Sequence, residues 1–339
     1  RRAWRAAAEE VAPVVRDGEL TREPGYITDA ITDEALSFLD RMSEPFYLSV
    51  HYTAPHSPWT ADGEARNQHP EEITELYDDC PFKSCPQEPT HPDATGLTHR
   101  NMGSHESLKG YFAAIPAMDR QVGRILDRLE EMGVREDTLV VFTSDNGFSC
   151  GHHGFWGKGN GTFPMNMYEN SVTVPFIASH PGTIPEGAVS DAMMSSYDFA
   201  PTLLDYLSIP RPDDYEGPGE SYRRVLTGEE DEARDRVVVH SEYGTVRMIR
   251  TGDWKYVHRY PRGPHELYDL ANDPDERENL IDDPDQASRV ERLRDDLAAW
   301  FGEYVDPARD GARFPVTGLG QKTRIDDGQP GEGVFHPRD

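Results

Sequence analysis

The sequence predicts an α/β fold in which a mixed, largely parallel sheet is flanked by helices and followed by a small C-terminal antiparallel sheet with one helix. An amphipathic helical pattern precedes a short apolar strand pattern twice, over residues 28–52 and 108–142. This order is typical of parallel strands joined by helical crossovers. Four short strand-like segments between residues 236 and 270 are close enough for antiparallel hairpins. We therefore expect a main α/β domain over 1–215, a small antiparallel-sheet domain over 216–305 and a tail over 306–339.

Composition limits the possible partners of the protein. The chain has 62 Asp and Glu residues against 34 Lys and Arg, which gives a formal net charge of −28, and 29 of the 34 basic residues are arginine. Such an acidic surface repels phosphate backbones and anionic membranes, so we expect no nucleic-acid partner. The acid-rich, lysine-poor balance is similar to that of proteins from salt-loving organisms.

The three cysteines, Cys80, Cys85 and Cys150, match the spacing of neither a disulfide framework nor a zinc site, so we expect buried or idle thiols. No apolar run approaches the roughly 20 residues of a membrane-spanning helix, and no span is predicted. The sequence begins at Arg1 without an initiator Met, so a signal peptide or a further segment of the fold could lie upstream. The compartment and the oligomeric state are left open.

The first part of the chain alternates helical and extended patterns. Residues 1–25 are charged and end in a Pro-Gly pair, which predicts a fraying helix or connector. Residues 28–39 have apolar spacing of three and four, so we expect an amphipathic helix with a Thr or Asp N-cap. Residues 46–52 are aromatic and β-branched, which predicts a strand that two prolines stop. Residues 60–106 are polar and contain several prolines, and we assign them only a long surface excursion.

A second helix and strand lead to the most informative loop. Apolar residues recur at helical spacing from Leu108 to Met132, a helix that Pro116 should start or kink and Gly133 should end. Residues 139–142 then form an apolar run short enough for a strand buried on both faces. After this loop we expect a strand at 172–178 and a helix at 198–207 with Asp capping, followed by a boundary at 210–234. Beyond the boundary we expect strands at 236–241, 245–250, 254–260 and 266–270 and a helix at 286–302.

Asp145 and Asn146 come directly after the strand predicted at 139–142 and offer a carboxylate and an amide oxygen side by side. Hard oxygen ligands of this kind suit Ca²⁺ or Mg²⁺ rather than zinc. The alternative is an ordinary Asp-Asn-Gly turn. Their position favours a site, because ligands of open α/β sheets bind at the carboxyl ends of the strands.

A glycine-rich loop at 151–159 adds a His-His pair and Lys158 shortly afterwards. A lysine among glycines and aromatics is a good group for binding a sulfate or phosphate oxygen, because partial burial strengthens its attraction for anions. The alternative is a solvated lysine beside metal-free histidines. His56 follows the strand predicted at 46–52 and could face the same site, or it could be a structural histidine.

Taken together, these segments resemble the type I sulfatases of the alkaline phosphatase superfamily. The matches run in the family's order over most of residues 26–302. They read FYLSVHYTAPHSPW at 46–59, YFAAIPAMDRQVGRILDRLEEMGV and TLVVFTSDNG within 111–147, GHHGFWGKG at 151–159, YENSVTVPFI at 168–177, YDFAPTLLDYL at 197–207, and IRTGDWKYV with ELYDLANDPDERENL within 249–280. The resemblance implies an alkaline-phosphatase-like fold and the hydrolysis of sulfate esters.

Carried over residue by residue, the resemblance implies a role for each candidate. Asp145 and Asn146 would be metal ligands, usually to Ca²⁺. Lys158 would contact the sulfate and stabilise charge, and His56 would contact the sulfate and aid the departure of the leaving oxygen. His153 would line the substrate pocket, although the family often has an acid at the position before it.

The sequence departs from the family pattern in two places. The family's nucleophile is a formylglycine made from Cys or Ser in a C/S-x-P-x-R stretch, which is absent here; Cys80 and Cys85 are each followed at once by Pro. An early apolar strand ending in the Asp-Asp pair that supplies the other metal ligands is absent as well. Both parts normally lie N-terminal to where this chain begins. We therefore expect the C-terminal portion of a sulfatase, binding Ca²⁺ weakly or not at all by itself.

Three interpretations of the function stay open at this point. The leading hypothesis is a sulfuric ester hydrolase acting on a small-molecule or carbohydrate sulfate ester, with its nucleophile upstream of this chain. The second is a phosphodiesterase or phosphonate hydrolase of the same superfamily, although Asn146, where such relatives often have His, favours the sulfatase. The third is an inactive truncated domain that at most binds an anion, which the absent nucleophile supports.

Overall fold

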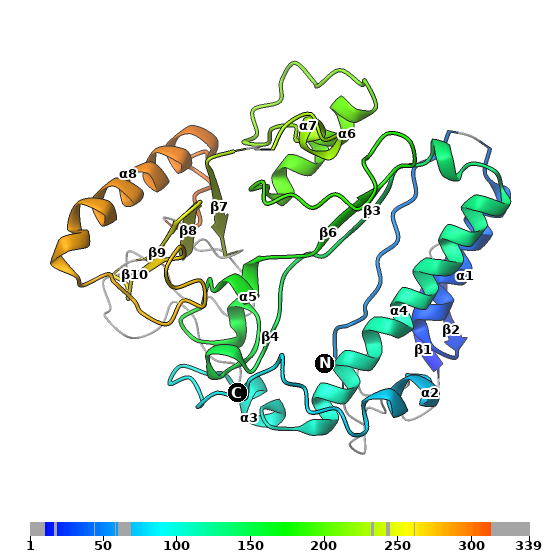
Figure 1. Ribbon diagram of the computed structural model, residues 1–339, viewed down its shortest axis with the longest axis horizontal. Coiled ribbons are helices and arrows are strands. Elements are labelled where there is room, and N and C mark those ends of the chain that lie inside the picture. Colours follow the sequence, from blue (N-terminus) through cyan, green and yellow to red (C-terminus); the bar gives the residue numbers. More distant parts are fainter. Residues whose placement is uncertain are drawn as a thin grey trace. The chain divides into compact units, whose positions relative to one another are not determined.

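The computed structural model describes residues 11–16, 19–43, 45–57, 59, 69–231, 234–241, 245–260 and 262–312. These residues form two compact units, which we describe separately (Figure 1). The first unit is drawn from 1–88 and 100–138, and the second from 89–99 and 139–339. The domain limits expected after residues 215 and 305 stay predictions, and most of the expected tail, 313–339, lies outside the described residues.

The first unit contains an antiparallel hairpin where the sequence pattern predicts a fraying helix or connector. β1 (Val11–Arg16) pairs with β2 (Glu19–Pro24), and Arg16 lies opposite Glu19. The prediction is wrong for these residues, because β1 is rich in valine and the Asp-Gly sequence between the strands is typical of a two-residue hairpin turn. Residues 1–10 lie outside the described part of the chain.

Two long helices of the first unit confirm the helical patterns. α1 (Ile27–Arg41) buries Ala35 and Leu39, although its N-cap residue is Tyr26 rather than a Thr or Asp. α4 (His105–Glu131) begins after Ser104, whose hydroxyl accepts a hydrogen bond from the Ser107 N–H at 3.1 Å. The two helices pack together, and ion pairs join them from Arg124 to Asp33 at 2.7 Å and from Arg128 to Asp40 at 2.8 Å.

Of the two residues predicted to limit α4, Gly133 ends the helix but Pro116 does not begin it. Gly133, with φ of 71°, ends the helix as predicted, since glycine adopts the left-handed conformation without strain. Pro116 lies inside the helix and does not begin it.

Short helices complete this part of the chain: α2 (Glu71–Thr74), η2 (Glu75–Tyr77), α3 (Gly96–Asn101) and η3 (Arg135–Asp137).

Residues 46–52 are not a strand of any sheet, so the strand predicted there is wrong. Their side-chain exposure nevertheless alternates as it does in a strand, and Tyr47 is 72% exposed between two half-buried neighbours. The local pattern is therefore present, but a ladder also needs a partner strand. The described part of the chain pairs none with this segment.

In the second unit, β3 (Val140–Thr143) and β6 (Phe176–Ser179) form a two-stranded sheet with Val140 opposite Ser179. Both strands are predicted by the sequence, but the pair is antiparallel, as are all strand pairs of the described residues. The parallel pairing expected of the strands at 46–52 and 139–142 is not found among the described residues. The first three residues of β3 are half-buried rather than buried on both faces.

Small elements occupy the stretch between β3 and β6 and the region that follows. β4 (Ser149–Cys150) pairs with β5 (Trp156–Gly157), and the helical turns are η4 (His152–Gly154), η5 (Gly159–Gly161) and α5 (Glu169–Val172). After β6 come η6 (Ser196–Asp198), α6 (Phe199–Tyr206) and α7 (Arg223–Leu226). Asp198 stands at the N-cap position of α6 but makes no side-chain capping bond to that helix; its carboxylate instead accepts the Ser195 N–H at 2.8 Å.

The C-terminal sheet and helix confirm the predicted antiparallel unit. The sheet has the order β10-β9-β8-β7 and consists of β7 (Arg236–His240), β8 (Val246–Thr251), β9 (Trp254–Arg259) and β10 (Glu266–Asp269). After η7 (Pro284–Gln286), α8 (Ala287–Tyr304) lies along this sheet (Figure 1). Leu293, Leu297 and Phe301 of α8 pack with Ile249 and Tyr256 in one buried cluster. None of the helices in the described ranges has the length and apolar character needed to cross a membrane.

Candidate functional site

The turn after β3 brings a carboxylate and an amide to the end of that strand. The Ser144 hydroxyl donates to the backbone oxygen of Asn146 at 3.0 Å and lies 3.4 Å from Asp145 Oδ1. The side chain of Asp145 is 84% exposed, whereas Asn146 is half-buried and donates from Nδ2 to the Gly147 carbonyl at 2.9 Å. Two oxygen ligands of different charge therefore follow one another at the carboxyl end of β3.

Lys158 reaches back to these two residues. Its ammonium group donates a hydrogen bond to Asn146 Oδ1 and lies 4.0 Å from Asp145 Oδ2. The Lys158 side chain is 36% exposed. Because an ammonium group carries three N–H donors, it can bond Asn146 and still donate to another acceptor. The structure therefore brings together three of the five predicted site residues.

Asn166, which the sequence does not single out, holds the backbone of the lysine-bearing loop. Its Nδ2 donates to the carbonyl oxygens of Lys158 at 3.0 Å and Gly159 at 3.2 Å, and its backbone N–H donates to Gly159 at 3.0 Å. The Ser171 hydroxyl donates to Asn166 Oδ1 at 2.7 Å, which fixes the orientation of the amide. Asn166 is 2% exposed, so water does not compete for these bonds.

Two glycines of this region are required by close backbone contacts. A Cβ on Gly147 would lie 2.2 Å from the carbonyl oxygen of Asn170, and one on Gly154 would lie 1.8 Å from that of Pro89. Gly154 also has φ of +72°, which disfavours other residues. The glycine-rich sequence is thus explained by tight packing of the loop rather than by freedom of movement.

His153 lies on an aromatic cluster. Its ring stacks on Tyr168 with a centroid separation of 3.7 Å and an interplanar angle of 7°. Burial raises the pKa of Tyr168 to about 12, so the histidine stacks on a neutral phenol. The His153 backbone is left-handed, with φ of 56°, a conformation that non-glycine residues adopt rarely and often at binding sites. Its role in a substrate pocket stays a prediction.

His56 belongs to the first compact unit, whereas the other four candidates belong to the second. It follows a cis peptide bond between Ala54 and Pro55, and the residue is exposed. Its Nδ1 lies 3.1 Å from the backbone oxygen and 3.3 Å from the hydroxyl of Ser57, and its ring lies 6.3 Å from that of Trp59. These contacts describe an ordered local turn, and the predicted place of His56 at the same site stays a prediction.

The fit to a calcium ion is partial. Asp145 and Asn146 offer two oxygen ligands, whereas Ca²⁺ takes six to eight. Within the described ranges, no group of three or more His, Cys, Asp or Glu side chains is placed to hold a metal ion. These residues therefore do not complete a calcium site. The three cysteines form no disulfide in the described part of the chain; Cys85 and Cys150 are buried and Cys80 is half-buried.

Comparison with known proteins gives the family. Residues 5–209, more than half of the chain, match the family model described as Sulfatase. The chain belongs to the sulfatase family. Residues 151–301 of this sulfatase-family chain also match the model of the N-sulphoglucosamine sulphohydrolase C-terminal region. That second match contains both the Lys158 loop and the C-terminal sheet.

Two relatives illustrate the extent of the similarity. N-acetylglucosamine-6-O-sulfatase of Bacteroides thetaiotaomicron is 27% identical over 364 residues, which cover 86% of this sulfatase-family chain and 64% of the relative. Arylsulfatase of Clostridium perfringens is 30% identical over 319 residues, covering 86% of this chain and 62% of the relative. The chain therefore spans somewhat less than two thirds of the length of these two relatives.

A solved structure confirms the predicted fold class of this sulfatase-family chain. The structure is that of a protein in complex with its substrate D-glucosamine-2-N,6-O-disulfate. It matches with a TM-score of 0.72 at 25% identity, covering 90% of this chain and 76% of the other. The alkaline-phosphatase-like α/β fold with a small C-terminal antiparallel sheet is thus the fold of the family to which the chain belongs.

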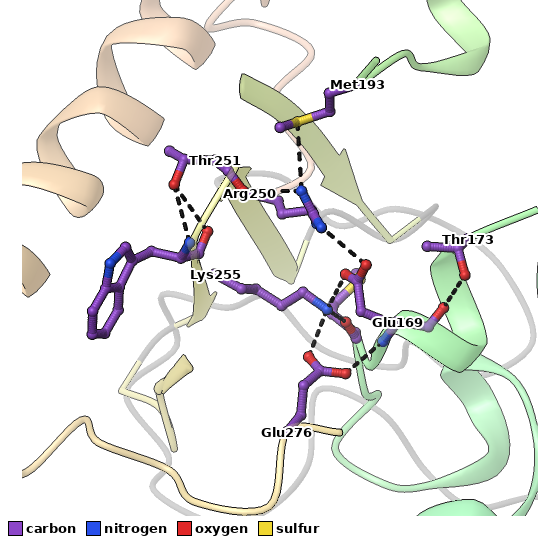
Figure 2. Close-up of polar contacts among 9 residues, drawn as sticks. Glu169, Thr173, Met193, Arg250, Thr251, Lys255 and Glu276 are labelled. Atoms are coloured by element: carbon purple, nitrogen blue, oxygen red, sulfur yellow. Dashed lines mark hydrogen bonds and ion pairs between the residues drawn. The ribbon is translucent and has the colours of Figure 1, made fainter. Parts of the chain in front are cut away.

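Sequence reasoning missed a buried ion cluster in the same unit of the sulfatase-family chain. Lys255 on β9 lies 2.6 Å from both a Glu169 oxygen and a Glu276 oxygen, and Figure 2 shows these side chains pointing toward one another. The available signal was a lysine inside an apolar strand pattern at 254–260. A charge at such a position predicts buried partners, because an unpaired buried ammonium is very costly.

Proposed function

We propose that this sulfatase-family protein hydrolyses sulfate esters. The observation that carries the proposal is the meeting of the Lys158 ammonium with Asn146 and Asp145 at the carboxyl end of β3. A half-exposed cation with donors to spare suits a sulfate oxygen, and the adjacent oxygen ligands suit a divalent cation. Membership of the sulfatase family supports a sulfate ester as the substrate of this arrangement.

Lys158 is proposed to stabilise the charge of the reacting sulfate. Charge redistributes over the sulfate oxygens as the bond from sulfur to the leaving oxygen breaks. A fixed ammonium aimed at one of those oxygens lowers the barrier, because it needs no reorganisation during the reaction. Asn166 keeps the Lys158 backbone in place through its two carbonyl contacts, which makes the ammonium a positioned group.

The two histidines are proposed to act on the alcohol side of the substrate. His56 would contact the sulfate and assist departure of the leaving oxygen, since an imidazole exchanges protons near neutral pH. His153, held by its stack on Tyr168, would line the pocket for the alcohol. The relative named N-acetylglucosamine-6-O-sulfatase favours a sulfated carbohydrate as the substrate class.

Asp145 and Asn146 are proposed as two ligands of a Ca²⁺ ion whose further ligands come from outside the described residues. When bound, such an ion supplies Lewis-acid stabilisation of a sulfate oxygen. Two ligands do not make a calcium site, so no step is assigned to the ion. The family's formylglycine nucleophile has no Cys or Ser motif in this sequence, and we assign the nucleophile to none of its residues.

Sulfate release tests the proposal. The gene product that contains this chain and its upstream sequence would be produced with a formylglycine-generating enzyme and assayed on 4-nitrophenyl sulfate and N-acetylglucosamine-6-sulfate. We expect hydrolysis that Lys158→Ala reduces by about a hundredfold or more. Lys83→Ala, at an exposed lysine of the other unit, should leave the rate unchanged.

Two other outcomes would reject sulfate ester hydrolysis. Faster turnover of 4-nitrophenyl phosphate diesters or phosphonate esters than of sulfates would assign the protein to phosphoester or phosphonate hydrolysis. Absence of turnover on every substrate, with correctly matured protein, would favour a domain that only binds an anion.

A further inference from the structure

A buried ion cluster joins the C-terminal sheet to the segment before β6. Lys255 on β9 is fully buried, and Glu276 is 3% exposed. The Lys255 ammonium lies 2.6 Å from Glu169 Oε1 and 2.6 Å from Glu276 Oε1, and it donates to the carbonyl oxygen of Met167 at 2.9 Å. Arg250 on β8 adds a second cation, 3.2 Å from the other oxygen of Glu169 (Figure 2).

The cluster combines directed hydrogen bonds with ion pairs. The Lys255 ammonium donates to Glu276 Oε1 at 2.6 Å and to the Met167 carbonyl at 2.9 Å, and it forms an ion pair with Glu169 Oε1. The second oxygen of Glu276 accepts the backbone N–H of Glu169 at 2.6 Å. Glu276 also has φ of 53°, an uncommon conformation that its buried bonds hold in place. Burial raises the pKa of Glu276, while Lys255 opposes that shift.

The Lys255 ammonium of the cluster contacts a short segment, residues 166–171, which we call the bracket. Met167 and Glu169 of the bracket receive the contacts from the C-terminal sheet. One end of the bracket, Asn166, bonds the Lys158 and Gly159 carbonyls. The bracket therefore links the buried cluster to the backbone of the candidate anion-binding lysine through direct bonds.

The other end of the bracket contacts the turn that carries Asn146. The N–H of Gly147 donates to the carbonyl oxygen of Ser171 at 3.1 Å. Gly147 is so close that a Cβ there would lie 2.2 Å from the Asn170 oxygen. Within the bracket, the Ser171 hydroxyl bonds Asn166 Oδ1, so its two ends are tied to each other. Asn146 and Lys158 thus take their relative positions from the same six residues.

We propose that Lys255, Glu276 and Asn166 are positioning residues, which act through the bracket to hold the Lys158 ammonium against Asn146. The proposal rests on the proposed function for its catalytic meaning, but its structural content is independent of activity. A buried ion pair adds little net stability compared with apolar side chains of the same shape, whereas its directed bonds define a geometry. A cluster of this kind is therefore suited to positioning.

Lysine NMR tests the proposal without any need for turnover. The chain has only five lysines, Lys83, Lys109, Lys158, Lys255 and Lys322, so the Cε signals of ¹³C-labelled lysine are few. Lys158→Arg assigns the Lys158 signal. Glu276→Gln keeps the shape of the remote end of the cluster but removes its charge. Asn166→Asp removes the Nδ2 donor to the Lys158 and Gly159 carbonyl oxygens and keeps the backbone bond to Gly159. We expect both variants to shift the Lys158 signal.

Asp198→Asn is the matched control. Asp198 is also a buried carboxylate of the second unit, 1% exposed, and it is paired with Arg234 and accepts the backbone N–H groups of Ser195 and Glu220. It makes none of the bracket contacts described above. We expect Asp198→Asn to lower the thermal midpoint as Glu276→Gln does, while leaving the Lys158 signal in place.

A titration with inorganic sulfate adds a second measurement. We expect Glu276→Gln and Asn166→Asp to weaken sulfate binding by about threefold to tenfold, and Asp198→Asn to leave it unchanged. An unmoved Lys158 signal in both Glu276→Gln and Asn166→Asp overturns the proposal, as does an equal movement in Asp198→Asn. If Glu276→Gln does not fold, Asn166→Asp decides alone. A moved Lys158 signal in a protein that binds no sulfate supports the positioning role and counts against the proposed function.

Discussion

Lys158 and Lys255 belong to the same compact unit but to opposite kinds of environment. Lys158 lies on a glycine-rich loop, is about one third exposed, and contacts an amide oxygen with a carboxylate 4.0 Å away. Lys255 lies on a central strand, is fully buried, and contacts two carboxylates and a carbonyl oxygen. The comparison separates a partly exposed lysine that can take a further ligand from a buried lysine enclosed by groups of its own chain.

The difference shows that a lysine fixes local geometry when it is fully buried and can bind a ligand when it is partly exposed. Where burial is complete, a cation is tolerated only with a full set of acceptors, and its contribution is to fix geometry. Where burial is partial, some donors stay available and the charge can act on a ligand. We therefore expect substitutions at Lys255 to act first on stability and those at Lys158 to act first on anion binding and catalysis.

The largest expected effect is the loss of stability in Lys255→Ala. The change leaves the buried Glu276, beside the half-buried Glu169, without the cation that they share, which costs about 3–5 kcal/mol of unfolding free energy. Urea denaturation followed by circular dichroism measures this loss. The same substitution at the exposed Lys83 is the control and should leave the urea midpoint unchanged. A Lys255→Ala protein as stable as the wild type would contradict the picture of a charge cluster that needs its cation.

The next effect is a loss of catalysis without a loss of stability in Lys158→Ala. Removing a positioned cation from a reacting oxygen costs about 3–4 kcal/mol of transition-state stabilisation. The unfolding free energy should hardly change, because the Lys158 side chain is partly exposed and its partner Asn146 is only half-buried. Steady-state kinetics beside urea denaturation separate the two quantities. A large loss of stability at Lys158 would erase the contrast with Lys255.

A smaller loss of stability is expected for Gly147→Ala, which disrupts the contact between the Asn146 turn and the bracket. The new methyl group would overlap the carbonyl oxygens of Asn170 and Thr173, so the backbone must move at a cost of about 1–3 kcal/mol. Thermal unfolding and the Lys158 NMR signal should both change. Gly123→Ala in α4 is the control, since its Cβ meets nothing within 4 Å. There, loss of a helical glycine should raise stability by about 0.5–1 kcal/mol.

The smallest expected effect is a pH dependence of the unfolding free energy that arises from His258, which lies on the same strand as Lys255. Burial, together with the nearby His265, Arg247 and Arg294, lowers the pKa of His258 to about 4. Unfolded histidine titrates near pH 6.5, so between pH 4 and 6.5 the unfolded chain binds more protons than the folded one. The free energy of unfolding should therefore rise with pH across this window, by about 1 kcal/mol after allowance for the partial exposure of the ring.

Urea denaturation at several pH values, compared between wild type and His258→Gln, measures that contribution. The variant should show a flatter dependence between pH 4 and 6.5. An unchanged slope would mean that His258 titrates alike in the folded and unfolded chains, and that the sheet does not exclude water from this ring as it does from Lys255.

Local sequence patterns predicted the helices and the C-terminal sheet well. The apolar spacings behind α1, α4 and α8 arise from side chains three and four residues apart, which a helix places on one face whatever surrounds it. The strands β7 to β10 follow one another at short intervals, so their hairpins are also set by neighbouring residues. The same locality explains why Asp145, Asn146 and Lys158 could be selected as candidates within one short stretch.

Only the tertiary structure decided which strands pair and which charges are buried. β3 pairs with β6 in antiparallel fashion and residues 46–52 pair with no described strand, because a ladder depends on a partner distant in sequence. Lys255, Glu169 and Glu276 are far apart along the chain, and their meeting is set by how α5 and the loop after β10 pack against β9. The sequence by itself thus determined the long helices, the C-terminal strands and the chemistry of the candidate loop, but neither the β1–β2 hairpin nor the unpaired state of 46–52. Packing determined the bonds that hold that loop, since burial is a property of contacts between segments and not of any one of them.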